Sequence, residues 1–295
     1  MPRHLFSIDD IHDVEIDSIL HRAHQLRDAP HIAHSTGSNA KLVGLLFLQA
    51  SLRTRLGFAA ACARLGWQSV LVVEQRSSDV SMAESIEDTL RVAAGMVDLL
   101  VARLPVPIES VAWNSPVSVI SGGDAGPFAE HPTQAIADLF AIELERGEVG
   151  NLHIAICGDL RMRSARSLIR LLRRRGPRRL SLISVPALMD SDVADDPYSG
   201  LGFCNLNEIA DVDVLYVSGI PHRAIPENVR DTLRVTNDVM RCLPKNAVVL
   251  SPMPVIDEID SLARQDNRVK IFNQSDNSLY VRMAVLEAFG RASVG

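Results

Sequence analysis

Short runs of aliphatic and β-branched residues alternate along the chain with longer stretches in which apolar residues recur at helical spacing. The short runs are strand candidates and cover residues 42–48, 69–73, 99–102, 117–121, 153–157, 180–185, 212–217 and 247–250. Helical spacing covers residues 54–65, 85–96, 133–145, 164–174 and, at the end, about 278–289. The alternation predicts an α/β protein in which helices cover both faces of parallel sheets.

A polar segment separates two such α/β patterns. Residues 145–151 contain Gly147 and Gly150, follow a long helical pattern and precede a new strand candidate. We therefore predict two doubly wound parallel-sheet domains, formed by residues 1–146 and 147–277. The final helix, residues 278–290, is expected to return and pack on the first domain.

The composition favours a protein with a full apolar core and small ligands. The chain has 295 residues, of which 47% are hydrophobic, and 30 basic against 36 acidic residues leave a net charge of −6. This balance argues against a chain-wide surface for nucleic acid. No apolar stretch reaches the ~18 residues of a membrane span. The polar N-terminus is unlike a signal peptide, so we expect a cytoplasmic protein without membrane contact.

The cysteines and histidines do not indicate a metal site. Cys62, Cys157, Cys204 and Cys242 stand singly in mostly aliphatic surroundings, which favours buried thiols that fill the core over a zinc site or disulfides. The histidines of the first 34 residues lack a carboxylate or cysteine that would complete a ligand set.

The first candidate site is an anion site at the start of a helix. Ser51-Leu52-Arg53-Thr54-Arg55 follows the strand candidate 42–48 and opens a helical pattern. Backbone N–H groups and the positive end of the helix dipole face an anion there, while Ser51, Thr54 and Arg53 add side-chain donors. The local pattern equally allows Ser51 to act only as a helix cap beside solvated arginines.

Two further candidates lie at strand-to-helix junctions. Pro132 suits a first helical turn, which places His131 at a helix N-terminus, where the neutral imidazole is favoured as a donor to a carbonyl. Residues 158–166 follow the strand candidate 153–157 and place arginines beyond the carboxyl end of a sheet, where open α/β folds bind ligands.

In their order along nearly the whole chain, these motifs resemble those of the aspartate/ornithine carbamoyltransferase family. The S-T-R-T-R phosphate motif of that family is similar to residues 51–55, and its H-P-x-Q…D-L-F motif is similar to residues 131–134 and 138–140. The other matching positions are Phe58, Leu65-Gly66, Glu84-Ser85, Asp88-Thr89, Arg103, Gly158-Asp159-Leu160, Arg163, Pro252-Met253-Pro254, Asp257-Glu258-Ile259, Gln274, Asn277 and Val281-Arg282-Met283-Ala284.

The resemblance implies a carbamoyl-phosphate-binding domain in residues 1–146 and an amino-acid-binding domain in residues 147–277. It implies that the phosphate is held by Ser51, Arg53, Thr54 and Arg103. The carbamoyl oxygen would be polarised by Thr54, Arg103 and His131. Together with the phosphate ligand Arg53, these three residues are the catalytic candidates. The carbamoyl nitrogen would contact Gln134 and carbonyl oxygens around Met253, with a cis bond before Pro254. Arg163 would bind the α-carboxylate of the acceptor.

The resemblance also implies partners and a metabolic setting. The substrates would be carbamoyl phosphate and an amino-acid-like acceptor, with no metal or organic cofactor, because positioning and electrostatics suffice for the transfer. A homotrimer is expected, with active sites between subunits, in amino acid metabolism or pyrimidine biosynthesis.

Several positions depart from the family pattern. Leu52 stands where the phosphate motif has threonine, and Gln49 replaces a glutamate. Residues 76–83, where aspartate enzymes supply a lysine to the neighbouring subunit, contain none. Gly219 and Pro221 stand at the positions of an arginine and a glutamine that bind aspartate, and Ser251 replaces a histidine.

These departures leave two interpretations. In the first, the chain is a carbamoyltransferase whose acceptor is an amino acid other than aspartate, with space for a different side chain at Gly219. In the second, it is a catalytically impaired relative that acts as a structural or regulatory binding subunit. The missing lysine, threonine and glutamate favour the second interpretation. The retained Arg53, Thr54, Arg103, His131 and Gln134 favour the first.

A third function class comes from an arginine-rich run. It comprises Arg161, Arg163, Arg166, Arg170, Arg173, Arg174, Arg175, Arg178 and Arg179. Such a run can contact nucleic acid. Interleaved leucines, the net charge of −6 and the helix C-terminus favour a solvated helix face instead.

Overall fold

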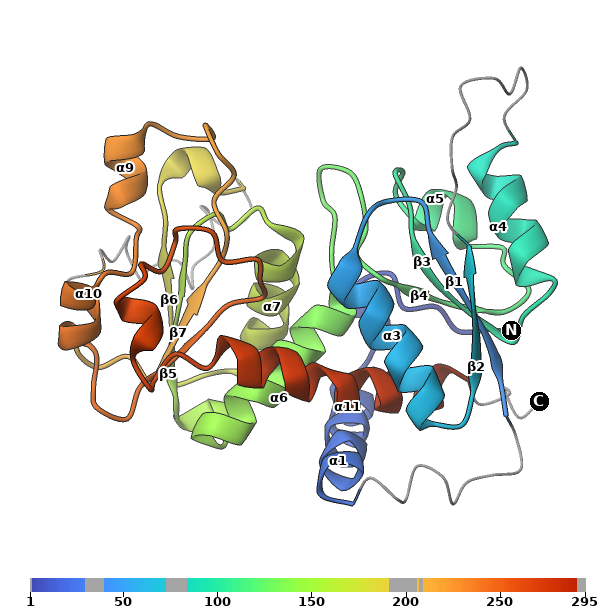
Figure 1. The fold of residues 1–295 in the computed structure, drawn as a ribbon, viewed down its shortest axis with the longest axis horizontal. Helices are drawn as coiled ribbons and strands as arrows, with labels where there is room; N and C mark the ends of the chain where they lie inside the picture. Colours follow the sequence, from blue (N-terminus) through green and yellow to red (C-terminus); the bar gives the residue numbers. More distant parts are fainter. Residues whose placement is uncertain (1, 30–39, 73–83, 191–205, 207–208, 291–295) are drawn as a thin grey trace. The chain divides into compact units, whose positions relative to one another are not determined.

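The computed structural model describes residues 2–29, 40–72, 84–190, 206 and 209–290 (Figure 1). It divides into two compact units, one formed by Met1–Ala137 with Asn277–Gly295 and the other by Asp138–Asp276. The unit boundaries fall within two long helices, α6 (Pro132–Arg146) and α11 (Ile271–Gly290). Each unit contains one four-stranded sheet.

The sheet of the first unit is parallel and has the strand order β2-β1-β3-β4. Its strands are β1 (Leu42–Phe47), β2 (Gln68–Val72), β3 (Leu99–Arg103) and β4 (Ser118–Ser121). In the β1–β3 register Phe47 lies opposite Arg103, so the two strands end side by side. The turn that follows β1 therefore begins at the Arg103 end of β3.

Helices α3 (Leu52–Arg64) and α4 (Ile86–Ala94) pack against strands of this sheet (Figure 1). The same unit contains α1 (Asp13–Asp28) and the short α5 (Glu109–Ala112). The C-terminal part of α11 joins them, because Arg22 of α1 binds Glu287 with two hydrogen bonds of 2.6 and 2.8 Å. The Arg282 guanidinium lies 5.8 Å from the centre of the Phe58 ring of α3.

The sheet of the second unit is also parallel and has the order β6-β5-β7-β8. Its strands are β5 (His153–Cys157), β6 (Arg179–Ile183), β7 (Val214–Val217) and β8 (Val248–Leu250). The helices α7 (Arg163–Arg175), α9 (Glu227–Asp231) and α10 (Asn237–Cys242) connect them. The buried strand residues and the inner faces of these helices form the core of the unit.

The predicted fold class is confirmed, and each strand candidate is a strand of one of the two sheets. The main difference is the last helix, which begins at Ile271 rather than near residue 278. Its first turns contain the polar Asn273, Gln274 and Ser275, which interrupt the apolar spacing from which the helix was predicted. The division into domains of residues 1–146 and 147–277 stays a prediction.

The cysteines differ in exposure. Cys62 in α3 and Cys157 in β5 are fully buried, as predicted, whereas Cys242 at the end of α10 is exposed. Cys204 lies outside the described residues. None of the described helices has the length and apolar character that crossing a membrane requires.

Asp213 provides a test of what fixes the N-terminal edge of the second sheet. Its carboxylate accepts hydrogen bonds from the His153 backbone N–H at 2.9 Å and from the Arg146 and Arg178 guanidinium groups at 2.7 and 3.4 Å. Burial alone would raise the pKa of Asp213, but these hydrogen bonds lower it below the usual 3.8. A carboxyl whose pKa is lowered by folding stabilises the protein above its unfolded pKa and loses that effect as the pH falls.

We therefore expect Asp213→Asn to lower the free energy of unfolding by about 1–2 kcal/mol at neutral pH, measured by urea denaturation. The difference from wild type should narrow only when the pH falls below 3.8. Asp238→Asn is the matched control, because the side chain of Asp238 is 85% exposed in its pair with Arg241. An equal loss of stability in both variants would contradict the expectation.

Candidate functional site

The turn after β1 leaves a serine hydroxyl at the start of α3. Ser51 takes the N-cap position, yet its side chain makes no capping hydrogen bond. The interpretation of the Ser51 hydroxyl as a helix cap is therefore wrong. Thr54 is buried in the first turn, whereas Leu52 is 70% exposed and contributes little to the core. Arg53 is exposed on the same turn. A serine hydroxyl and the N-terminal backbone N–H groups of a helix together suit an anion.

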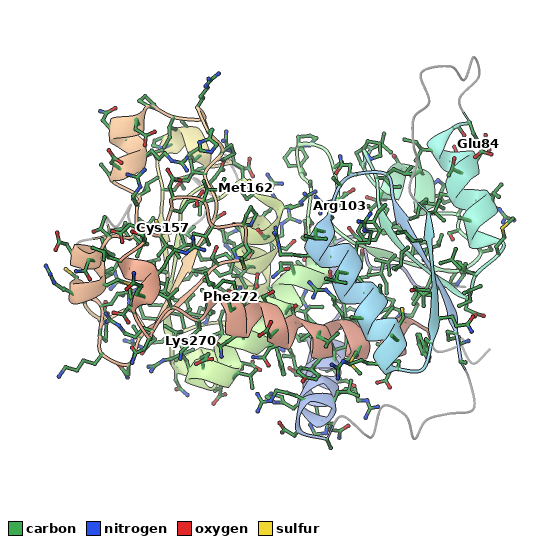
Figure 2. The ribbon with its side chains drawn as sticks, in the orientation of Figure 1. Glu84, Arg103, Cys157, Met162, Lys270 and Phe272 are labelled. Carbon is green, nitrogen blue, oxygen red and sulfur yellow. The ribbon has the colours of Figure 1, made fainter. Side chains whose placement is uncertain are left out.

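Arg103 lies beside this turn at the end of β3 (Figure 2). Its carbonyl oxygen accepts from the backbone N–H groups of Leu48 and Gln49 at 2.9 and 3.2 Å, which ties the turn after β1 to the end of β3. The Arg103 guanidinium donates to the Gly122 carbonyl at 3.3 Å, in the loop after β4. Three neighbouring strand ends thus meet around this side chain.

Gly123 shows that Arg103 and His131 converge. A Cβ atom added at Gly123 would lie 2.8 Å from Nη1 of Arg103 and 3.0 Å from Cδ2 of His131. Gly123 also has a φ of +108°, a conformation that residues with a side chain rarely adopt. Gly123 was not among the residues predicted from the sequence, although the Gly122-Gly123 pair directly after a strand candidate was the available signal.

His131 is buried at the start of α6. Its carbonyl accepts from the N–H groups of Gln134 and Ala135, as expected for the residue before a helix. Its Nδ1 atom lies 3.4 Å from the Thr133 hydroxyl. The preceding residue is fixed as well, because the buried Glu130 carboxylate accepts from the Ser7 hydroxyl at 2.7 Å. The imidazole is therefore held by its own helix and by the chain before it.

In the second unit, the loop after β5 leads to Arg163, the first residue of α7. Gly158 is required here, because it has a φ of +111° and an added Cβ would lie 2.2 Å from the Ser218 carbonyl oxygen. Arg161 folds back on Asp159 with two hydrogen bonds of 3.0 and 2.9 Å. The Arg161 guanidinium therefore braces the loop, and Arg163 begins the helix.

Residues 251–254, which follow β8, form a second loop in this unit and are named the 251–254 segment below. Met253 has a φ of +52°, and the Met253–Pro254 peptide bond is cis, as the family resemblance implies. The loop after β7 is held by the buried charged side chains of Glu258 and Arg230. Glu258 accepts from the Ile220 N–H at 3.0 Å, and Arg230 donates to the Ile220 carbonyl at 2.6 Å.

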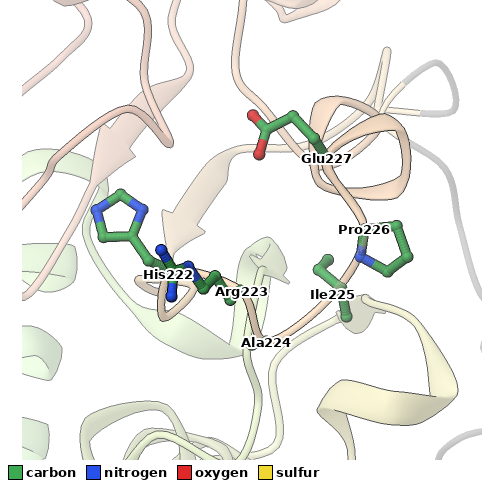
Figure 3. Close-up of a pocket in the computed structure, with 6 residues that line it drawn as sticks. All are labelled: His222, Arg223, Ala224, Ile225, Pro226 and Glu227. Atoms are coloured by element: carbon green, nitrogen blue, oxygen red, sulfur yellow. The ribbon is translucent and has the colours of Figure 1, made fainter.

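A cavity of about 1000 Å³ lies at the loop between β7 and α9 (Figure 3). Its lining consists of His222, Arg223, Ala224, Ile225, Pro226 and Glu227. Arg223 has a φ of +63°, which is uncommon for a residue other than glycine. Four residues before it, a Cβ added at Gly219 would meet no atom nearer than 3.6 Å, so this position has room for a side chain.

Part of the arginine-rich run is engaged with acidic residues. Arg166 is buried and binds Asp190 at 2.5 Å, and Arg178 binds Asp213 at 3.4 Å. Arg179 lies 3.7 Å from Asp211. Residues 76–83, which lack the lysine, lie outside the described residues. Within the described part of the chain, no group of three His, Cys, Asp or Glu side chains is placed to hold a metal ion.

The structure thus separates the predicted site residues by unit. The first unit holds Ser51, Arg53, Thr54, Arg103, His131 and Gln134 at the carboxyl ends of its strands. The second unit holds Arg163 at the start of α7, after the loop that follows β5, and Met253 in the loop that follows β8. Their roles in binding and catalysis stay predictions.

Comparison with known proteins covers both halves of the chain. The carbamoyl-P binding domain of the aspartate/ornithine carbamoyltransferase family matches residues 3–144. The Asp/Orn binding domain of that family matches residues 150–289.

Among individual proteins, the chain is 33% identical to the aspartate carbamoyltransferase catalytic subunit of Archaeoglobus fulgidus, over 97% of this chain and 98% of that one. Its fold is similar to the catalytic subunit of M. jannaschii aspartate transcarbamoylase, with a TM-score of 0.83, 29% identity and 97% of each chain covered. It is also similar to aspartate transcarbamoylase from Trypanosoma cruzi in complex with N-(phosphonacetyl)-L-aspartic acid, with a TM-score of 0.82, 25% identity, and 97% and 95% of the two chains covered. With both domains matched in order, the chain belongs to the aspartate/ornithine carbamoyltransferase family of enzymes.

Proposed function

We propose that this protein transfers the carbamoyl group of carbamoyl phosphate to the amino group of an amino acid. The observation that carries the proposal is the convergence of Arg103 and His131 on Gly123. It lies beside the turn in which the Ser51 hydroxyl makes no capping hydrogen bond. A fixed cation, an imidazole and a helix N-terminus at one edge of a sheet suit a ligand that carries both a phosphate and a carbonyl.

The donor half of the site lies in the first unit. Ser51, Arg53, Thr54 and Arg103 hold the phosphate through hydroxyl and guanidinium donors. Thr54, Arg103 and His131 donate to the carbamoyl oxygen, on which negative charge grows as the amine attacks. Gln134 accepts a hydrogen bond from the carbamoyl NH₂ group. These groups are stationary donors, so they stabilise the charge without reorganising at the moment of reaction.

The acceptor half of the site lies in the second unit. Arg163 binds the α-carboxylate, and carbonyl oxygens of the 251–254 segment accept from the carbamoyl nitrogen. The neutral amine of the acceptor forms a new C–N bond to the carbamoyl carbon. The C–O bond to phosphate breaks, phosphate leaves with the electron pair, and the attacking nitrogen passes one proton to the departing phosphate. The residues supply position and charge stabilisation, without a covalent intermediate on the protein.

We further propose that the preferred acceptor is an amino acid other than aspartate. Gly219 and Pro221 supply no charged or amide side chain, and Gly219 has room beside it. Each charge-assisted hydrogen bond to a substrate carboxylate contributes about 1.5–3 kcal/mol, so its absence disfavours aspartate. Aspartate is nevertheless the necessary comparator, because His222 and Arg223 line the cavity nearby and the named relatives are aspartate enzymes.

Calorimetric titration with carbamoyl phosphate, followed by an amino-acid panel scored for the ureido product, tests both parts. We expect carbamoyl phosphate to bind at micromolar to millimolar concentration and one acceptor other than aspartate to give most product. Arg53→Ala should abolish both binding and product. Donor binding without product from any acceptor would favour a binding subunit without activity, and product mainly from aspartate would overturn the acceptor proposal.

Leu52 allows a matched comparison in the same titration. Leu52→Thr places a hydroxyl at an exposed position of the phosphate turn, and we expect donor affinity to rise about threefold or more. Leu56→Thr changes a leucine that is 62% exposed one turn further along α3 and should leave donor affinity unchanged. Equal effects of the two substitutions would contradict the proposed contact at residue 52.

Gly123→Ala tests the convergence itself. The added Cβ would displace Arg103 and His131, so we expect donor affinity to fall about tenfold or more. Gly126→Ala is the control, because Gly126 also has a positive φ, +98°, but its Cβ would meet Pro107 instead. Equal losses in the two variants would show that backbone strain, and not the two side chains, causes the effect.

We also propose a homotrimer, which rests on the family resemblance. Light scattering on the purified protein is expected to give three times the chain mass of 32.2 kDa. A monomer at micromolar concentration would refute the trimer.

A further inference from the structure

A chain of buried hydrogen bonds runs through the second unit, outside the residues given roles so far. The Tyr216 hydroxyl of β7 donates to one carboxylate oxygen of Asp138 at 2.7 Å. The Gln274 amide of α11 donates to the other oxygen at 2.6 Å. The Gln274 carbonyl oxygen accepts from the Ser251 backbone N–H at 2.8 Å. We name Asp138, Tyr216 and Gln274, with the Ser251 N–H, the Asp138 network.

Burial makes each bond of this network costly to break. Asp138 and Tyr216 are fully buried, and Gln274 and Ser251 are only 3% exposed. A buried polar group that loses its partner is not compensated by water. Burial, together with the charge of Asp138, also raises the pKa of Tyr216 well above its ordinary value, so the hydroxyl stays protonated and remains a donor.

The carboxylate also fixes the direction of the network. An ionised carboxylate only accepts hydrogen bonds, so the Gln274 amide must turn its NH₂ group toward Asp138. Its carbonyl oxygen then faces the other way, where it can serve only a donor, and the donor present is the Ser251 N–H. The Asp138 carboxylate of α6 thereby sets the position of the Ser251 backbone nitrogen through Gln274 of α11.

The 251–254 segment has few backbone N–H groups that could hold it in place. Pro252 and Pro254 carry no N–H group, so only Ser251 and Met253 can donate. Met253 also has a φ of +52°, which costs conformational energy for a residue with a side chain and persists only where the surroundings impose it. The bond at Ser251 is therefore an anchor at the entrance to a strained turn.

We propose that Asp138, Tyr216 and Gln274 are positioning residues that select the carbamoyl group of the donor. They hold the carbonyl oxygens of the 251–254 segment where these accept from the carbamoyl NH₂ group. The inference rests on the proposed function, in which this segment contacts the carbamoyl nitrogen, and it adds that the contact depends on side chains that never touch the substrate.

Acetyl phosphate provides a probe that isolates this effect. It has a methyl group where carbamoyl phosphate has NH₂, so it gains nothing from acceptor oxygens placed at that position. Wild-type protein should bind carbamoyl phosphate about tenfold more tightly than acetyl phosphate. Gln274→Met removes both hydrogen bonds of the side chain at similar size, and we expect it to reduce this preference at least threefold by calorimetric titration.

Tyr216→Phe is the second variant, because it removes one hydroxyl only and is the safer substitution for folding. It should reduce the preference by a smaller factor than Gln274→Met. Ser181→Ala is the control, since it removes another buried hydrogen bond of the same sheet, that between Ser181 and Nε2 of His153 at 2.8 Å. The preference of this control for carbamoyl phosphate should equal that of wild type.

The outcomes distinguish failure of the positioning role from failure of the proposed carbamoyl transfer. An unchanged preference, or an equal loss of affinity for both phosphates in the network variants, would overturn the positioning role, because general destabilisation does not distinguish NH₂ from CH₃. Failure of the wild-type protein to bind carbamoyl phosphate would overturn the proposed function, and the positioning role with it. A reduced preference in the network variants alone supports the proposal.

Discussion

Parallel pairing of the strands is the constraint on which the candidate chemistry depends. In a parallel sheet all carboxyl ends lie along one edge, so the loops that leave them are brought together whatever their separation in sequence. In the first unit the pairing continues one step beyond the strands, since Leu48 and Gln49 donate to the Arg103 carbonyl. In the second unit Gly158 donates to Ile183 and Ser218 donates to Cys157 in the same manner. The sheets therefore fix where the loops begin.

Buried carboxylates then fix the shape of the loops in the second unit. Glu258 accepts from the backbone N–H groups of Ile220, Ile256 and Asp257 and from the Arg230 guanidinium. Asp138 acts on Ser251 through Gln274. An ionised acid is useful here because it accepts several hydrogen bonds and cannot donate, which leaves one arrangement of its partners. Irregular backbone thus becomes as well defined as the strands, at the cost of burying charge.

The sequence alone was sufficient to place the strands and helices along the chain, because aliphatic runs and helical spacing are local signals. It was also sufficient to single out Arg103 and His131, through motifs. It could not show that these two side chains meet at Gly123, since that contact joins the end of β3 to the loop between β4 and α6. The link between Gln274 and Asp138 joins residues 136 positions apart, and no local pattern carries such information. The polar Asn273, Gln274 and Ser275 interrupt the apolar spacing and so concealed the true start of α11.

Each unit also contains a buried cysteine, Cys62 in the first and Cys157 in the second, whose reaction with a thiol reagent can report local opening. Burial raises the pKa of Cys62 in the first unit and of Cys157 in the second unit to about 12, so neither forms the nucleophilic thiolate while its unit is closed. Alkylation at either position must then wait for local opening, and its rate measures the free energy of opening of one unit at a time. The exposed Cys242 reacts without opening and serves as an internal reference for the reagent. The native cysteines Cys62 and Cys157 therefore report the local opening of the first and the second unit separately.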